Sequence, residues 1–164
     1  MPSFSFDIVS EIDKAEMNNV FTQAEKEIAT RYDFRGTSAA IEWLDDKKGF
    51  KLTGDSEWQV EAVLDIVRKK LAAREQSSKV LDLSKEKVVA NLRTTWEIPF
   101  KAGLAQDIAK KIAADIRTEV PKAKPQIQGE TVRVTSASKD ELQKVILLVK
   151  AKEYDIPLQF VNYR

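Results

Sequence analysis

Apolar and polar residues alternate in two stretches of the chain, residues 4–9 and residues 95–100. A period of two residues predicts a half-buried β-strand in each. After each stretch, apolar residues recur at helical spacing, which predicts one amphipathic helix ending near Arg31 and another ending before Pro121. The inward positions are Met17, Val20, Phe21, Ala24 and Ile28 in the first helix, and Leu104, Ile108, Ile112, Ile116 and Val120 in the second.

Two short strands joined by a polar turn follow each of these helices, and a second helix comes after them. The predicted strand pairs are 41–44 with 50–53, and 126–128 with 131–135. Asp13, Ser56 and Ser138 stand where a helix N-cap is expected, each with Glu or Gln three residues on. Further strands are expected at residues 80–83 and 158–163.

The two halves of the chain form an internal repeat. When residues 50–53 are placed over 132–135, Ser56 falls on Ser138 without a gap, and four apolar positions of the following helix match as well. The sequence therefore predicts an α+β protein of two ferredoxin-like β-α-β-β-α-β domains, residues 1–90 and 91–164.

The composition excludes several kinds of chemistry. The 164 residues include no cysteine and no histidine, so disulfides, thiolate nucleophiles, Cys zinc sites and histidine bases are absent. No glycine motif for phosphate binding occurs. We therefore expect a protein without enzymatic activity, cofactor or metal. Since neither a membrane span nor a signal peptide is evident, we expect a cytoplasmic location.

Charge and strand alternation bear on nucleic-acid binding. The net charge is +1, but residues 1–58 carry −5, which leaves +6 for residues 59–164. Alternation turns the large apolar groups toward the helices, so the open sheet faces are polar and lack an aromatic stacking platform. Lys51 and Arg133 lie on these faces. They are either phosphate contacts or solvated strand residues that pair locally.

Residues 31–36 combine two guanidinium groups with two aromatic rings. Arg31 and Arg35 suit phosphate, and Tyr32 or Phe34 suits a nucleotide base. The alternative is a helix exit at which the rings enter the core while the arginines pair with nearby acids.

This segment and three others together resemble the bacterial YajQ family over essentially the whole chain. The others are residues 6–10, residues 126–129 with 132–134, and residues 157–164. Arg164, at the end of the last segment, joins the phosphate-binding candidates. The family often has lysine at Arg35, aspartate at Glu130 and phenylalanine at Tyr163. The resemblance implies two ferredoxin-like domains and an exchange of their first strands, residues 4–9 and 95–100.

The resemblance also implies a cytosolic nucleotide-binding protein that takes a purine nucleotide or a cyclic dinucleotide. Cyclic di-GMP sensing together with a transcription factor is one form of this function. An RNA-binding module, for example for tRNA, and a protein-interaction module are the alternatives that remain open.

Overall fold

The computed structural model describes residues 3–164, which form two compact units, each with one antiparallel sheet and two long helices. We call Ile12–Lys101 the continuous unit, and residues 3–11 with Ala102–Arg164 the split unit. Among residues 3–164, no helix has both the length and the apolar character needed to cross a membrane.

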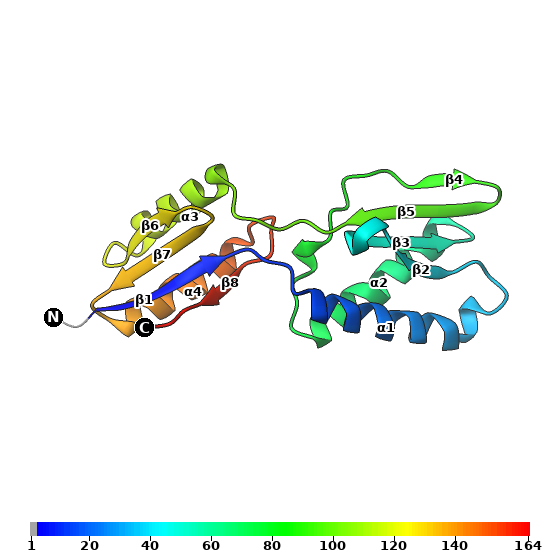
Figure 1. Ribbon diagram of the computed structural model, residues 1–164, viewed down its shortest axis with the longest axis horizontal. Coiled ribbons are helices and arrows are strands. Elements are labelled where there is room, and N and C mark those ends of the chain that lie inside the picture. Colours follow the sequence, from blue (N-terminus) through cyan, green and yellow to red (C-terminus); the bar gives the residue numbers. More distant parts are fainter. Residues whose placement is uncertain (1–2) are drawn as a thin grey trace. The chain divides into compact units, whose positions relative to one another are not determined.

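The continuous unit contains a sheet in the order β2-β3-β5-β4 with two helices packed on it (Figure 1). Its elements are α1 (Lys14–Thr30), β2 (Ala40–Trp43), β3 (Gly49–Gly54), α2 (Glu57–Ala73), β4 (Val88–Ala90) and β5 (Arg93–Pro99), with 3-10 turns at Tyr32–Phe34, Asp45–Lys47 and Ser78–Val80.

The split unit contains a sheet in the order β6-β7-β1-β8, with α3 and α4 packed on it (Figure 1). Its elements are β1 (Phe4–Val9), α3 (Gln106–Glu119), β6 (Lys124–Gln128), β7 (Thr131–Ser136), α4 (Lys139–Lys152) and β8 (Gln159–Val161).

The first strand of the chain lies in the sheet of the split unit. β1 pairs with β7 and β8, and β5 pairs with β3 and β4. The predicted ranges 1–90 and 91–164 would place β1 in the first half of the chain and β5 in the second. In the structure, β1 lies in the sheet of the second half and β5 in the sheet of the first half. Sequence periodicity cannot detect this, because it reports which face of a strand is buried but not its neighbours.

The alternation that predicted strands at residues 4–9 and 95–100 is confirmed by burial. Phe6 and Ile8 on β1, and Trp96 and Ile98 on β5, lie in the two cores. The large apolar groups therefore face the helices, as period-two alternation requires. Apolar residues of α1 and α2 enter one core, and those of α3 and α4 the other.

Two local predictions are wrong. Residues 80–83 are not a strand: Ser78–Val80 is a 3-10 turn, and only Leu81 forms a bridge, to Phe100. The fourth strand of this sheet is β4, whose residues are all exposed and so lack the alternation that would have revealed it. Ser138 is the N-cap of α4, but its side chain makes no capping bond. The side-chain caps at Asp13 and Ser56 are confirmed.

Candidate functional site

Arg31, at the end of α1, forms an ion pair within its own segment. Its Nε and Nη2 donate to Oδ1 and Oδ2 of Asp33 at 3.0 and 2.7 Å. Its guanidinium carbon lies 4.6 Å from the centre of the Phe34 ring. The hydrogen bond from Arg31 lowers the pKa of Asp33 below its usual value. A phosphate would have to compete with this two-point contact to bind Arg31.

The other residues of this segment separate into core and surface. Phe34 is buried in the core of the continuous unit, whereas Tyr32 is 83% exposed. The guanidinium carbon of Arg35 lies 5.5 Å from the centre of the Tyr32 ring. Within residues 3–164, Arg35 has no ion pair, and it lines a cavity of about 450 Å³ at the end of α1. Arg35 and Tyr32 are therefore the members of this segment open to a ligand.

The two strand cations, Lys51 and Arg133, face acidic residues across their sheets. Lys51 on β3 lies between Glu42 on β2 and Glu97 on β5. Arg133 on β7 donates from Nε to Oδ1 of Asp7 on β1 at 3.0 Å. Opposite charges in directly facing positions stabilise a sheet. Arg133 forms an ion pair with Asp7, whereas Lys51 faces its two acids by strand register.

Asp7 is buried, and two side chains donate to its carboxylate. Arg133 donates to Oδ1, and Asn162 donates from Nδ2 to Oδ2 at 2.9 Å. The hydrogen bond from Arg133 is the main reason that the pKa of Asp7 lies below its ordinary value. The carboxylate therefore stays ionised at neutral pH and holds Arg133 against the sheet.

Arg164 continues the backbone pairing of β1. Its N–H donates to the carbonyl of Ser5 at 2.9 Å, and its carbonyl accepts from the Ser5 N–H at 3.1 Å. Its side chain lines a cavity of about 370 Å³ in the split unit together with Lys139. The predicted residues thus fall into two units: residues 31–35 and Lys51 in the continuous one, Arg133 and Arg164 in the split one. Lys51 and Arg35 line different cavities.

A cavity that the sequence analysis did not predict lies beside the first turns of α1. Its volume, about 640 Å³, is in the range typical of small-molecule sites. The first turns of α1, the turn between β2 and β3, and the end of β5 all contribute to it. The lining residues are Ile12, Lys14, Met17, Asn18, Trp43, Asp46, Lys47, Lys48, Pro99 and Phe100.

The aromatic residues of this cavity belong to a larger ring cluster. The Trp43 ring stacks on Phe21 at 4.8 Å and contacts Phe50 at 5.0 Å. The Phe100 ring meets Phe50 edge-on at 4.9 Å. Because Phe50 is fully buried, the two rings that reach the cavity are fixed from behind. A flat ligand ring would therefore meet a pre-formed aromatic surface.

Three lysines give the same cavity a positive charge. Lys14 comes from α1, and Lys47 and Lys48 come from the β2–β3 turn. Within residues 3–164, none of the three forms an ion pair with a carboxylate. Asp46 is the acidic residue of the lining, so the charged lining sums to +2. Cations without acidic partners are the groups that can bind a phosphate at least cost.

The β2–β3 turn that carries two of these lysines has an unusual backbone. Asp46 and Lys47 have φ values of 57° and 54°, in the left-handed region that most residues avoid. The Phe100 N–H donates to the Lys48 carbonyl at 2.7 Å, which ties the turn to the end of β5. Such backbone strain is frequent at functional sites.

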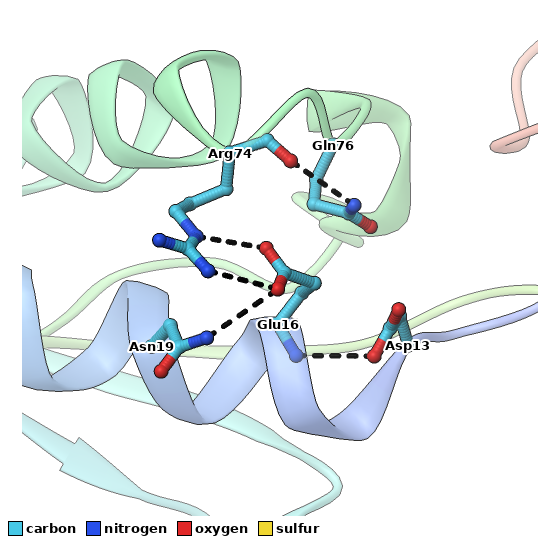
Figure 2. A network of polar contacts seen from close by, with 5 residues as sticks. All are labelled: Asp13, Glu16, Asn19, Arg74 and Gln76. Carbon is cyan, nitrogen blue, oxygen red and sulfur yellow. Dashed lines mark hydrogen bonds and ion pairs between the residues drawn. The ribbon is translucent and has the colours of Figure 1, made fainter.

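An ion pair fixes the first turn of α1 (Figure 2). This turn also borders the cavity. Arg74, at the end of α2, donates from Nε and Nη2 to the two carboxylate oxygens of Glu16 at 2.8 and 3.0 Å. Asn19 also donates to Glu16, and Asp13 caps the Glu16 N–H. The hydrogen bond from Arg74 lowers the pKa of Glu16. Because Glu16 pairs with Arg74, it does not neutralise the lysines of the cavity.

The cavity was not predicted because its residues come from three separate segments: 12–18, 43–48 and 99–100. The sequence signal was present but ambiguous. Lys47 and Lys48 looked like an ordinary polar hairpin turn, and Trp43 and Phe100 like ordinary strand residues. Only the antiparallel register places these rings beside these lysines.

The chain matches the family model described as "Nucleotide-binding protein YajQ-like" over residues 4–164, and it belongs to this family. It is 44% identical over 165 residues to a protein of Nocardioides sp. named "Nucleotide-binding protein". It is 45% identical over 166 residues to a protein of Mycobacterium ulcerans and 44% identical over 165 residues to one of Streptomyces coelicolor, both also named as nucleotide-binding proteins. Each of these matches covers 100% of both chains.

Proposed function

We propose that this protein binds a nucleotide without catalysing a reaction. The names of its relatives support the class of ligand. The observation that carries the proposal is the cavity of the continuous unit, where three unpaired lysines adjoin the rings of Trp43 and Phe100. Lysine ammonium groups suit phosphate oxygens, and aromatic rings suit a base.

In the proposed site, Lys14, Lys47 and Lys48 contact phosphate, and Trp43 or Phe100 contacts the base. Arg35 and Tyr32, at the other end of α1, form the second candidate for such contacts. At that end, the exposed guanidinium of Arg35 would contact the ligand, close to the C-terminal carbonyl groups of α1. Since this end of a helix dipole disfavours anions, the lysine cavity is the better phosphate site.

We further propose that both units are ferredoxin-like repeats that have exchanged their first strands. The proposal is supported by the matching central strands, since β3 and β7 each lie between a hairpin partner and a strand from elsewhere in the chain. For the ligand we propose a purine nucleotide, with cyclic di-GMP as the first to test.

Isothermal titration with cyclic di-GMP, GTP and ATP tests this function. We expect saturable binding of at least one of them. Lys48→Ala should weaken it about tenfold or more, because one charge-assisted hydrogen bond is lost. Arg35→Ala is the matched control at the other end of α1 and should change the affinity less than twofold. Heat from none of the three ligands at millimolar concentration would refute the proposed function.

A further inference from the structure

Lys47 differs from the other lysines of the cavity because two contacts hold its ammonium group. Its Nζ donates to Oδ1 of Asn18 at 3.3 Å and lies 5.1 Å from the centre of the Trp43 ring. Among the described residues, the side chains of Lys14 and Lys48 make no comparable contact. The ammonium of Lys47 therefore rests on the aromatic surface of the cavity.

The position of this ammonium determines what can stack on Trp43. Phe21 covers one face of the indole ring, with the ring centres 4.8 Å apart and the planes inclined by 23°. Phe50 also contacts this ring, with the ring centres 5.0 Å apart. Phe21 and Phe50 do not line the cavity, whereas Lys47 does, so the ammonium of Lys47 lies on the cavity side of the indole. A base that stacks on Trp43 must take the place that Lys47 now holds.

We propose that Lys47 makes this site selective for phosphorylated ligands, because it covers the stacking face of Trp43 until a phosphate group draws its ammonium away. The inference rests on the nucleotide-binding function proposed above. A nucleotide supplies both partners of the exchange: its base replaces the ammonium over the indole, and its phosphate receives the ammonium.

A nucleoside supplies only the base. It must displace Lys47 from Trp43 and Asn18 and gives the ammonium no new partner within the ligand. An ammonium over an aromatic ring at a partly exposed position is a weak contact, so the resulting penalty is a modest factor in affinity. The contact of Lys47 with a phosphate is charge-assisted and stronger. Lys47 therefore acts in opposite directions on the two classes of ligand.

The experiment compares guanosine with GMP on the intact protein, by titration of the wild type and three variants. Lys47→Ala should weaken GMP about tenfold and strengthen guanosine about threefold. Lys48→Ala, the matched control, should weaken GMP and leave guanosine unchanged. Lys47→Arg keeps a cation that can cover the ring, so it should retain the preference for GMP. Circular dichroism of each variant should match that of the wild type.

Two results would overturn the inference. If Lys48→Ala weakens GMP but guanosine binds Lys47→Ala no better than the wild type, the cavity binds nucleotides and Lys47 does not cover the stacking face. If GMP does not bind the wild type although cyclic di-GMP, GTP or ATP does, the inference about Lys47 fails and the proposed function stands; if none of the four binds, both fail.

Discussion

The hairpins of the two units have the same place in their sheets but carry different residues at their turns. In the continuous unit, the β2–β3 turn carries Lys47 and Lys48. In the split unit, the turn between β6 and β7 is formed by Gly129 and Glu130. The β2–β3 turn also carries Asp45 and Asp46, so its charges sum to zero. The repeat register places the two pairs at equivalent positions, so a lysine pair in one unit corresponds to a glycine and a glutamate in the other.

The side chains next to the two hairpins also differ, because those of the continuous unit are aromatic and those of the split unit are not. Trp43 pairs with Phe50 across the first hairpin, and Ile127 pairs with Val132 across the second. Phe100 follows β5 at the place where Ser10 follows β1. The equivalent site in the split unit therefore has neither an aromatic surface nor a lysine pair. The fold alone does not make the proposed ligand site, since one unit has its rings and lysines and the other has the same hairpin without them.

Reversing the charge of the two lysines in the β2–β3 turn should have the largest effect. Replacing Lys47 and Lys48 by Glu gives the continuous unit the acidic character of the other hairpin. We expect nucleotide affinity to fall at least about 100-fold, because two phosphate contacts become repulsive. Titration calorimetry measures the loss. Glu130→Lys is the matched change in the split unit and should leave affinity within about twofold; an equal loss in both variants would show that the two hairpins are not different in function.

A smaller effect is expected from the cross-strand acids, Asp7 and Glu97, which hold equivalent positions. Asp7 is buried against Arg133, whereas Glu97 is exposed opposite Lys51. Asp7→Asn should lower the melting temperature by a few degrees, because Arg133 loses its carboxylate partner. Glu97→Gln should leave it nearly unchanged. Scanning calorimetry gives the melting temperature of both variants. Equal shifts would contradict a larger structural role for Asp7 than for Glu97.

The same acid should make stability depend on pH. The folded protein holds the pKa of Asp7 below its ordinary value. The stabilisation from this carboxylate is therefore fully present above about pH 4, the unfolded pKa, and is lost as the pH falls through the lower folded pKa. The wild type should lose more stability than Asp7→Asn when urea unfolding is followed from pH 5 down to pH 2. Parallel curves for the two proteins would rule out this role of Asp7.

The smallest effect concerns the backbone of the two turns. Gly129 has a φ of 61°, and Lys47 has nearly the same φ without being glycine. Lys47→Gly should raise the free energy of unfolding by about 1 kcal/mol while weakening nucleotide binding, and Gly129→Ala should lower it by about 1 kcal/mol. Urea unfolding gives both values. A Lys47→Gly protein that is less stable than the wild type would show that the turn is not strained.

The sequence predicted those features that depend on burial along single elements. The four helices, the alternating strands β1 and β5, and the side-chain caps at Asp13 and Ser56 follow from local pattern and local hydrogen bonding. β4 escaped prediction because its three residues are all exposed. The sheet neighbours of β1 and β5 depend on pairing between distant strands, which no local pattern encodes.

The candidate site was predicted less well for a related reason. Sequence reasoning favoured residues 31–36, where arginines and rings are adjacent in the chain, and Arg31 proved to be paired with Asp33. The rings and lysines of the cavity are distributed over three segments, and register alone brings them together. Residues that are neighbours in sequence are easy to recognise, but a site is defined by neighbours in space.

Titration of the protein with GMP, cyclic di-GMP and GTP, followed by NMR of the three indole N–H signals, tests the lysine cavity most directly. The signals are assigned by Trp43→Phe, Trp58→Phe and Trp96→Phe. We predict that the Trp43 signal shifts progressively to saturation with at least one ligand while those of Trp58 and Trp96 remain in place. Saturable shifts of Trp58 with an unchanged Trp43 signal would contradict a nucleotide site in this cavity.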